Sequence, residues 1–572
     1  MRLQLKSISI YCLFQVLFIS LSVSLQAQSG NTKNSVVEEI EEEEIIKKDN
    51  LMDSTYLGSN DELEGFTSIE DALANIDSAT VLNLKGKKLK VLSHEIGKLV
   101  NLEVLYLTNN QLSALPPEIS KLQNLTEINL SGNLFVEIPA ELYKLPNLTS
   151  LSMAKNKLVT VPKDISKLKS LSSLSLGGNQ ISTVSKEIGN IENLNSLYLE
   201  DNKLTTLPVE IGKLQNLMIL DLTNNKLTSL TPEIGKLGML TLLSLGKNQL
   251  TSLPDDIGNL PMLQTLTLTA NKLTELPSTI GNLAGLQMLN IDGGNQLTEL
   301  PKEIGNLAML QIVYLDENKL TSLPEEIGNL QNLQLLSLKF NQISSLPAEL
   351  GNAGGGQFFE ELDLTGNKLK TLIPEIGKIT NMQVLRLSSN LLENIPNQIG
   401  RLSNLQELNL AENNLTKLTD SICKLNSLIE LKLTRNKLTS LPENLGSLKK
   451  LEKLFLASNQ LSNLPQSLSN LENLQILNIS SNKITSLLND WQSLNGLLLM
   501  NCNDNLLKSL PETITDAPEL QQLMLANNQL ISFPKSIEKL ENLTKLDLRN
   551  NPLSPDEKNR LNIGLSKTKI LY

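Results

Sequence analysis

Leucine and other apolar residues recur along most of the chain in one pattern with a period of 23 residues. Each unit reads L-x-x-L-x-L-x-x-N-x-L, as in the segment Leu102-Glu-Val-Leu-Tyr-Leu-Thr-Asn-Asn-Gln-Leu112. Leucines two positions apart lie on one face of an extended chain, and the residues between them lie on the other face. The pattern therefore predicts one short strand in every unit. Strands stacked in register then form a long parallel sheet.

The second half of each unit predicts a short helical turn on the opposite side. It reads L-P-x-E-I-G-x-L-x-N-L, as in residues 207–217. Proline suits the first position of a helical turn. Ile211, Leu214 and Leu217 recur at a spacing of three and form one apolar stripe that faces inward. Gly212 allows the backbone of the neighbouring unit to approach closely.

An asparagine holds the same slot in twenty units, and Lys87 holds that slot in an imperfect first unit. Its amide both donates and accepts, so we expect it to bond backbone groups of its own unit and of the neighbouring unit. This structural column consists of Asn110, Asn133, Asn156, Asn179, Asn202, Asn225, Asn248, Asn271, Asn295, Asn318, Asn341, Asn367, Asn390, Asn413, Asn436, Asn459, Asn482, Asn505, Asn528 and Asn551.

The twenty asparagines in phase make residues 79–553 resemble the leucine-rich repeat superfamily. The L-P-x-x-I-G-x-L-x-N-L variant is similar to Ras-suppressor-type scaffolds and to bacterial secreted repeat proteins. The resemblance implies an α/β solenoid, a right-handed horseshoe of about 21 repeats. It implies a parallel concave sheet, short helical or 3-10 convex segments, and caps at both ends. It also implies protein–protein recognition as the usual role, with no catalytic residue in the repeats.

Residues 1–27 have the features of a secretory signal peptide. Arg2 and Lys6 precede an apolar run over residues 8–25, interrupted by Gln15, and cleavage is expected near Ala27. The alternative is an uncleaved anchor, although the interrupted run is short for a membrane span. No second long apolar segment follows, so the mature chain is expected to have no transmembrane span.

Residues 28–65 differ in composition from the repeats. They hold eleven acids and three lysines, hence −8 of the net charge of −11, and include the run Glu38-Glu-Ile-Glu-Glu-Glu-Glu44. A charge run without a hydrophobic period predicts an acidic disordered linker; an acidic recognition tail is the alternative. The signal contributes +2, which leaves about −5 for the rest. The absence of a basic field disfavours binding to nucleic acid or to anionic membranes.

Both ends of the repeat array carry signals for caps, which a solenoid needs to cover its terminal core. At the start, Thr67-Ser-Ile-Glu70 predicts a capping box and a cap helix within residues 66–78. At the end, within residues 554–572, Ser554 is expected to be an N-cap, Pro555 the first helical residue, and Glu557 the partner in a capping box. A helix at about 555–565 and a final extended piece at 569–572 are expected to close the sheet edge.

Candidate residues for enzyme chemistry are few. His94 is the one histidine and occupies a variable turn position, which predicts a surface residue. After the signal only Cys423 and Cys502 remain, more than three repeats apart, so no disulfide is expected between them. Cys502 replaces an inward leucine. No catalytic set, metal-ligand cluster or phosphate loop stands out, so the sequence predicts a non-enzyme without a cofactor.

Binding is therefore expected at the variable strand positions of the concave face. Aromatic residues flanked by polar ones are typical anchors, and the acids imply a protein partner with a basic patch. The candidates are Tyr106, Tyr198, Glu200, Asp221, Asp292, Tyr314, Asp316, Phe340, Glu361, Asp363, Arg386 and Phe455. The alternatives are neutral drift on a solvated face, and a calcium-binding stripe for which no ligand spacing argues.

Two places break the period. Residues 292–295 carry one extra residue and residues 352–359 carry three, with glycines in both. Phe359 falls in the slot of a core leucine and is expected to fill the core. Neutral length drift and a contact loop are the alternatives.

The sequence thus predicts a secreted, non-enzymatic protein-binding scaffold, with its destination the periplasm, the cell surface or the medium. A structural surface protein that adheres to glycans or host molecules is the runner-up.

Overall fold

The leucine pair of each repeat forms a three-residue β-strand in the computed structural model, which describes residues 65–572. The signal peptide and all but the last residue of the expected acidic linker lie outside the described residues. The repeat strands are β1 (Val81–Asn83), β2 (Val104–Tyr106), β3 (Glu127–Asn129), β4 (Ser150–Ser152), β6 (Ser173–Ser175), β8 (Ser196–Tyr198), β9 (Ile219–Asp221), β10 (Leu242–Ser244), β11 (Thr265–Thr267), β12 (Met288–Asn290), β13 (Ile312–Tyr314), β14 (Leu335–Ser337), β15 (Glu361–Asp363), β16 (Val384–Arg386), β17 (Glu407–Asn409), β18 (Glu430–Lys432), β19 (Lys453–Phe455), β20 (Ile476–Asn478), β21 (Leu499–Asn501), β22 (Gln522–Met524) and β23 (Lys545–Asp547).

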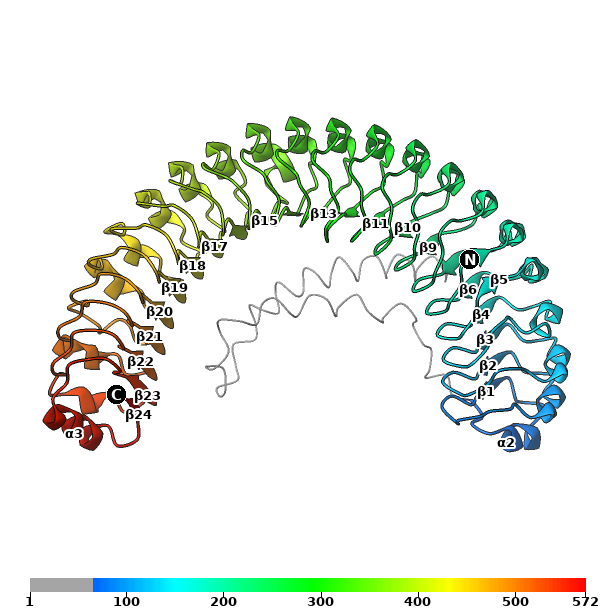
Figure 1. Ribbon diagram of the computed structural model, residues 1–572, viewed down its shortest axis with the longest axis horizontal. Helices are drawn as coiled ribbons and strands as arrows, with labels where there is room; N and C mark the ends of the chain where they lie inside the picture. The colour runs from blue at the N-terminus through cyan, green and yellow to red at the C-terminus, as the bar shows by residue number, and fades with distance from the viewer. Residues whose placement is uncertain (1–64) are drawn as a thin grey trace. The chain divides into compact units, whose positions relative to one another are not determined.

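These strands pair in parallel, each with the strand of the next repeat, as in Leu82 opposite Leu105. With the cap strand β24 (Lys569–Leu571) they form a sheet of 22 strands. Residues 65–572 curve into an arc with the sheet along its inner side (Figure 1). Leu289 pairs with Val313 and Leu336 with Leu362, so both insertions are absorbed outside the strands. The predicted parallel concave sheet is confirmed.

The outer side of the arc consists of short 3-10 turns (Figure 1). They are η1 (His94–Lys98), η2 (Pro117–Lys121), η3 (Leu142–Lys144), η4 (Lys163–Lys167), η5 (Lys186–Asn190), η6 (Val209–Lys213), η7 (Pro232–Lys236), η8 (Asp255–Asn259), η9 (Ser278–Asn282), η10 (Lys302–Asn306), η11 (Glu325–Asn329), η12 (Ala348–Gly356), η13 (Pro374–Lys378), η14 (Asn397–Arg401), η15 (Asp420–Lys424), η16 (Leu445–Ser447), η17 (Gln466–Asn470), η18 (Glu512–Asp516) and η19 (Ile537–Lys539).

Proline mostly precedes these turns rather than opening them. Pro208, for example, is the N-cap of η6, whereas Pro232 is the first residue of η7. The expected helical position of the repeat proline is therefore wrong by one residue in most units. Extended backbone at the N-cap suits the fixed φ of proline equally well. Gly212 behaves as predicted: a Cβ atom there would lie 2.6 Å from the carbonyl oxygen of Glu233 in the next turn.

One continuous apolar core runs between the strands and the 3-10 turns. Leu105, Leu107, Ile211, Leu214 and Leu217 are all fully buried, which confirms both inward stripes. Each buried leucine of this size contributes roughly 1.5–3 kcal/mol to stability. The core therefore needs no disulfide: Cys502 is a buried free thiol in a leucine slot, and Cys423 is a half-buried free thiol.

The asparagine column forms a hydrogen-bond ladder that joins each repeat to the one before it. Asn225 donates through Nδ2 to the carbonyl oxygens of Leu199 at 2.8 Å and Leu222 at 3.0 Å. Its Oδ1 accepts the backbone N–H of Leu204 at 2.9 Å. Nineteen of the twenty asparagines are buried, and Asn551 is half-buried beside the C-terminal cap. The ladder holds the strands in register and so fixes the positions of the inner-face side chains.

The N-terminal cap is helix α2 (Ile69–Ala74), which is shorter than the segment 66–78. Its N-cap is Ser68, not Thr67: the Ser68 hydroxyl accepts the N–H of Asp71 at 3.1 Å. The predicted capping box is thus wrong by one residue, because Ser68 has an equivalent acid three positions later. Phe66 forms a parallel bridge to Leu82 and covers the first edge of the sheet.

The C-terminal cap has the predicted helix and final strand, but Glu557 does not complete a capping box: its carboxylate accepts the N–H of Phe533 at 2.7 Å and bonds Arg560. Helix α3 (Pro555–Gly564) begins after Ser554, whose hydroxyl accepts the N–H of Glu557 at 3.2 Å. The chain then returns as β24 along β23. Leu561 is fully buried against the last repeat.

The second insertion extends η12, where Gly354, Gly355 and Gly356 all have positive φ. Left-handed backbone of this kind favours glycine. Phe359 is fully buried and fills the leucine slot as expected, whereas Phe358 is exposed. A feature that the pattern did not predict is the small sheet of β5 (Thr160–Val161) and β7 (Thr183–Val184). The two threonine hydroxyls lie 2.9 Å apart.

Candidate binding surface

The inner face of the sheet carries three side chains per repeat: the first and third strand residues and the residue two positions later. The first of these is half-buried in most strands, and the central strand residue is buried throughout β1 to β23. On β3, β4 and β6 the inner-face positions hold mainly small polar residues, such as Ser150, Ser152 and Ser173. Apart from Tyr106 on β2 and Glu127 on β3, charged and aromatic side chains are found on these strands from β8 onward. The chemistry of the face therefore changes along the arc while its backbone does not.

Acids on the C-terminal half of the inner face are paired with bases on neighbouring strands. Arg386 donates from Nε and Nη2 to the two oxygens of Glu407, both at 2.8 Å, and from Nη1 to Glu361 at 2.6 Å. Asp363 lies 3.7 Å from the same guanidinium. Burial disfavours the charged form of Arg386, but the bond to Glu407 and the surrounding carboxylates raise its pKa overall.

Two further groups on this half are also internally paired. Asp316 accepts the hydroxyl of Ser337 at 2.5 Å and the N–H of Lys339 at 2.9 Å, and its Oδ2 lies 3.1 Å from the Lys339 ammonium. Glu430 lies 2.7 Å from Lys432 and 3.5 Å from Lys453. Asp316, Glu361 and Asp363 are therefore not free acids as the sequence suggested: each already has a basic partner within the sheet, and their role in binding stays a prediction.

Four inner-face carboxylates have no salt bridge among the residues that the structure describes: Glu127 on β3, and Glu200, Asp221 and Asp292 further along the arc. Glu200 extends over the preceding repeat into the space left by Gly177, where a Cβ atom would lie 1.7 Å from Oε1. Its Oε2 is buried without a hydrogen-bond partner. Burial, and then the charges of Asp221 and Asp201, raise the pKa of Glu200 to about 7.

Asp221 and Asp292 are in a similar state. Burial is the largest cause that raises the pKa of each carboxyl. Asp221 accepts the backbone N–H of Thr223 at 2.9 Å, which opposes the shift. Oδ1 of Asp292 is buried without a partner. The Thr269 side chain opposes the effect of burial on the pKa of Asp292, and the charges of Asp316 and Glu317 add to it. Glu200 and Asp292, but not Asp221, therefore offer a cationic group a buried oxygen without a hydrogen-bond partner.

The raised pKa of Glu200 predicts a pH effect on stability. The Glu200 carboxyl has a pKa of 4.5 in the unfolded chain and about 7 in the folded protein. Between pH 4.5 and pH 7 it is therefore ionised in the unfolded chain but still protonated in the folded one, so stability falls as the pH rises through this window. At about 1.4 kcal/mol per pKa unit the loss amounts to roughly 3 kcal/mol. Glu200→Gln should therefore stabilise the protein relative to wild type at pH 8 and have little effect at pH 4.5. Calorimetric unfolding at both pH values measures this.

A matched control for that experiment is Glu127→Gln, a substitution of an inner-face acid on β3. The charge of Lys155 lowers the pKa of Glu200, but this effect is smaller than that of burial and of the neighbouring acids. If Glu200→Gln changes the unfolding temperature by the same amount at both pH values, Glu200 is not the titrating group.

The predicted aromatic anchors differ in accessibility. Tyr198 and Tyr314 are half-buried on β8 and β13, and Phe455 is half-buried on β19. Burial raises the pKa of the Tyr314 phenol to about 12. Tyr106 is only 3% exposed, so the expectation of an accessible anchor there is wrong. Phe340 is 57% exposed but lies beyond the end of β14, in the turn before Asn341, with a φ of 53°. Its expected place on a strand is also wrong.

Sequence reasoning missed the residues that act between repeats. Lys339 neutralises Asp316, Ser337 orients it, and Gly177 makes room for Glu200. The available signal was the period itself: residues 23 positions apart lie side by side on adjacent strands, and Lys339 is 23 positions after Asp316.

Catalytic chemistry has little basis in residues 65–572. The side chain of His94 is 75% exposed and touches Glu95. In this part of the chain no group of three His, Cys, Asp or Glu residues could hold a metal ion. Burial raises the pKa of both thiols, Cys423 and Cys502, above its usual value. Neither thiol is thus a ready nucleophile. Within the same residues no helix is long and apolar enough to cross a membrane.

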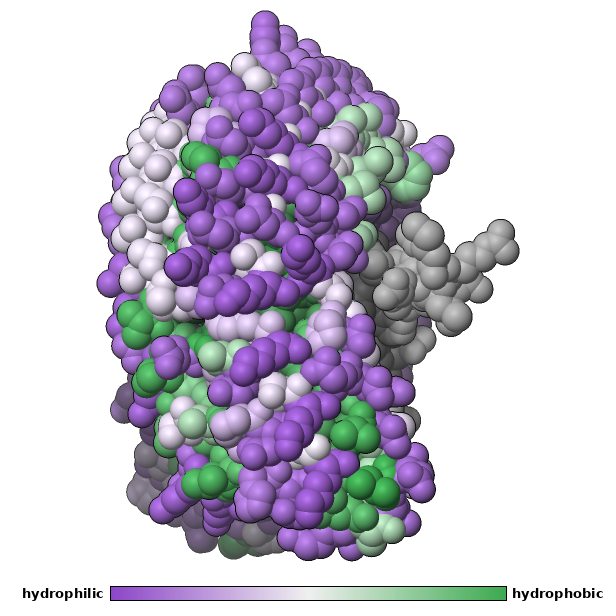
Figure 2. Space-filling view, turned by 90° about the vertical axis from the view of Figure 1, so that its right-hand side faces the viewer, coloured by the Kyte–Doolittle hydropathy of each residue, from purple (hydrophilic) through white to green (hydrophobic). Residues whose placement is uncertain are grey.

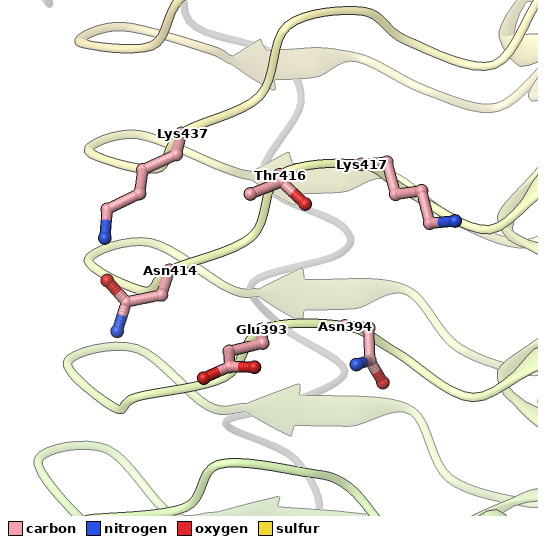
Figure 3. A pocket seen from close by; sticks show the side chains of 6 residues that line it. All are labelled: Glu393, Asn394, Asn414, Thr416, Lys417 and Lys437. Atoms are coloured by element: carbon pink, nitrogen blue, oxygen red, sulfur yellow. The ribbon is translucent and has the colours of Figure 1, made fainter.

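A pocket of about 410 Å³ lies away from the inner strands, on the loops after the asparagine column. Its lining consists of Glu393, Asn394, Asn414, Thr416, Lys417 and Lys437. Figure 3 shows these side chains spread over successive loops, with the two lysines pointing in different directions. They do not converge on one point as the groups of an active site do.

The surface of the first repeats is mostly hydrophilic, and its hydrophobic side chains form small separate groups (Figure 2). Exposed apolar residues in these repeats include Val91, Val136 and Val159. Isolated apolar residues of this kind are normal on a soluble surface. This flank therefore offers no clearer binding site than the inner face.

Comparisons with known proteins agree with the repeat architecture. The family model "Leucine-rich repeat region" matches residues 66–200, 233–314 and 357–483. The models "Leucine rich repeat" and "Leucine Rich Repeat" match residues 192–235 and 473–494. Among curated proteins none matches the sequence.

Several solved structures are similar. A leucine-rich repeat protein of Leptospira interrogans is 32% identical, with a TM-score of 0.48, over 89% of this chain and 100% of that one. The plant peptide hormone receptor RGFR1, in complex with RGF2, is 31% identical with a TM-score of 0.65, over 84% of this chain and 82% of that one. YopM from Yersinia enterocolitica is 25% identical with a TM-score of 0.62, over 90% and 96% of the two chains.

Proposed function

The chain belongs to the leucine-rich repeat family, and from this premise we propose that it is a secreted, non-enzymatic scaffold that binds a protein partner on its concave face. One observation carries the proposal. The core leucines and the asparagine ladder repeat almost unchanged, whereas the inner-face residues on the same strands differ in size, charge and aromaticity. A rigid scaffold with a variable exposed face is the arrangement of repeat proteins that recognise other proteins.

The energetics of the inner face support this choice. Glu200 and Asp292 hold buried carboxylate oxygens that lack a partner, and half-buried Tyr198 and Tyr314 lie on the strands nearby. Tyrosine offers a large contact area at a low cost in conformational entropy. Unsatisfied acceptors favour a partner with basic side chains over an acidic or neutral one.

The similar structures support a binding role without naming a ligand for this chain. RGFR1 was solved in complex with RGF2 as a plant peptide hormone receptor. We propose by analogy that this chain also binds a peptide or protein. The family models that match it are all leucine-rich repeat models, which is consistent with binding as its activity.

Secretion is proposed from the sequence of residues 1–27, which has a basic start, an apolar run and small residues at Ala27. Export would take the mature chain to the periplasm, the cell surface or the medium. Adhesion to glycans is the less favoured alternative. Sugar binding prefers a flat run of aromatic side chains, but Tyr198, Tyr314 and Phe455 are separated by several repeats.

Replacing Tyr314 with alanine should weaken partner binding by about 1–3 kcal/mol, the range of an aromatic anchor in an interface. The partner is first captured from the native exported fraction with immobilised wild-type protein. Titration calorimetry with the purified partner then compares wild type, Tyr314→Ala and the control Phe358→Ala. Phe358 is a matched aromatic residue, 46% exposed, that precedes β15 and lies off the inner strands.

Equal binding by wild type and Tyr314→Ala, with weakened binding by Phe358→Ala, would contradict a concave site. Unchanged unfolding temperatures of both variants show that an observed loss concerns binding rather than folding. Because the unsatisfied inner-face groups are carboxylates, the affinity should also fall when salt is added.

A further inference from the structure

We infer that the inner face between Tyr198 and Tyr314 binds an extended peptide segment of the partner through two basic side chains six residues apart. One basic side chain bonds Glu200 and the other bonds Asp292. The name "carboxylate trough" is used below for the inner-face residues of β8 to β13 and of the loops that directly follow them. This inference rests on the proposed function and specifies the chemistry of its partner.

The inner-face side chains between the two ends of the carboxylate trough are short. The residues two positions after β9, β10 and β11 are Thr223, Gly246 and Thr269, and the strands end in Asp221, Ser244 and Thr267. None of these side chains is longer than aspartate, and the first residues of the same strands add Ile219, Leu242 and Thr265 to the floor. Tyr198 and Tyr314 lie half-buried at the two ends, on β8 and β13. A peptide backbone therefore has room along the middle of the trough, between two aromatic residues.

At the first end of the carboxylate trough, Glu200 has a carboxylate oxygen that can accept a hydrogen bond from a cation. Its carboxyl group lies in the space above Gly177, and Oε2 has no hydrogen-bond partner although it is shielded from solvent. Ser175, two residues before Gly177, is only 3% exposed, and its hydroxyl also lacks a partner. A buried acceptor without a partner is costly to the folded protein, so a guanidinium or ammonium group that donates to Glu200 here would gain a charge-assisted hydrogen bond.

At the other end, Asp292 stands directly before the single-residue insertion. Gly293 and Gly294 continue the chain with φ values of 76° and 90°. The asparagine column is nevertheless continuous at this point, because Asn295 still donates to the carbonyl oxygen of Leu268 at 3.0 Å. Oδ1 of Asp292 is buried without a partner. The insertion thus changes the loop around this carboxylate and leaves the scaffold intact.

Free acceptors along the face favour the trough as the place for a basic ligand. Glu200, Asp221 and Asp292 take part in none of the salt bridges found within residues 65–572. Beyond Tyr314, the acids are already bonded to Lys339 or Arg386 and would have to exchange that partner for a ligand. The chain's own acidic segment, residues 28–65, has the same sign of charge as the trough and does not complement it. The occupant is therefore a basic segment of a different protein.

The spacing of the two carboxylates sets the spacing of the basic residues. Glu200 follows β8 and Asp292 follows β12, so four strand intervals separate them. At about 4.8 Å per interval the separation is roughly 19 Å. An extended peptide advances about 3.3 Å per residue, so six residues span this distance. Because side chains alternate along an extended chain, residues i and i+6 point to the same side, toward the floor of the trough.

Two synthetic peptides test the inference. Both carry a fluorophore and two arginines in a serine–alanine background, at positions i and i+6 in one peptide and at i and i+3 in its isomer. Anisotropy titrations at low salt measure the dissociation constant for full-length wild type, Glu200→Gln, Asp292→Asn and the double variant. Glu210→Gln, an outer-side substitution in η6, is the control.

We expect wild type and Glu210→Gln to bind the i, i+6 peptide about tenfold more tightly than the isomer, the effect of one additional charge-assisted bond. Each single variant should lose this preference, and the double variant should bind both peptides equally weakly. Equal affinity of the wild type for the two peptides overturns the inference, as does a preference that survives in the double variant.

The two proposals fail separately. If the captured partner still requires Tyr314 while the peptides bind without a spacing preference, the concave binding role stands and the dibasic segment is wrong. Unfolding temperatures of the four variants, measured in the same buffer, show whether a lost preference reflects a damaged fold.

Discussion

Replacing Asn225 with alanine is expected to lower the free energy of unfolding by about 2–3 kcal/mol, because several buried backbone groups lose their partners together. Asn225 joins Leu204 of the preceding repeat to the carbonyl oxygens of Leu199 and Leu222, at 2.8–3.0 Å. Alanine leaves these groups shielded from water and without a substitute. Calorimetric unfolding should therefore show a lower midpoint, and hydrogen exchange at the Leu204 amide should become faster.

The matched control is Asn216→Ala in the same repeat. Asn216 also donates to the preceding repeat, to the carbonyl oxygen of Glu192 at 2.8 Å, but it is exposed, so water can replace it. Its loss should cost less than about 1 kcal/mol. Equal midpoints for Asn225→Ala and wild type would refute the structural role of the column. Equal losses for the two asparagines would show that burial does not set the effect.

Deleting residues 554–572 should make the protein associate and lower its unfolding temperature. The deletion removes β24, whose Leu571 carbonyl oxygen accepts the N–H of Leu548 at 2.7 Å, and removes the buried contacts of Leu561. It uncovers Leu546, Leu548 and Leu553, which are at most 8% exposed in the intact protein. Three leucines correspond to a loss on the order of 5 kcal/mol, and an open strand edge invites pairing between chains.

Light scattering measures the association, and the fluorescence of Trp491 reports the unfolding of the C-terminal repeats. Trp491 is the only tryptophan and is fully buried, with its indole N–H bonded to the carbonyl oxygen of Leu488 at 2.9 Å. Deleting Tyr572 alone is the control, because it leaves β24 in place. A chain without residues 554–572 that remains monomeric and unfolds at the wild-type temperature would show that the cap does not protect the sheet.

The repeat architecture could be predicted from sequence because the spacing of leucine and asparagine within each unit is enough to define its strand and turn. Leu105 and Leu107 are inward because they are two apart, and Asn225 is buried because its slot recurs in phase. The caps were nearly as clear: Ser554 opens α3 as predicted, and Ser68 rather than Thr67 opens α2 because two adjacent hydroxyl residues compete for one cap.

The inner face was harder to predict because its properties arise between repeats. Asp316 looks like a free acid within its own unit, but Lys339 of the next unit neutralises it. Arg386 likewise bonds both Glu361 and Glu407, which belong to the units on either side of it. Tyr106 occupies an inner-face position on β2 and is nevertheless buried. The sequence of its own unit does not reveal this burial. Comparing residues one period apart would have found the charge pairs.

The most direct test of the concave binding role is to locate the partner on the surface. A photo-crosslinking amino acid is placed at Ser244, on the inner face of β10, or at Asp255, an exposed residue of η8 on the outer side. After illumination with the captured partner, we expect a covalent complex from position 244 and none from position 255. A complex formed from position 255 and not from position 244 would contradict the account.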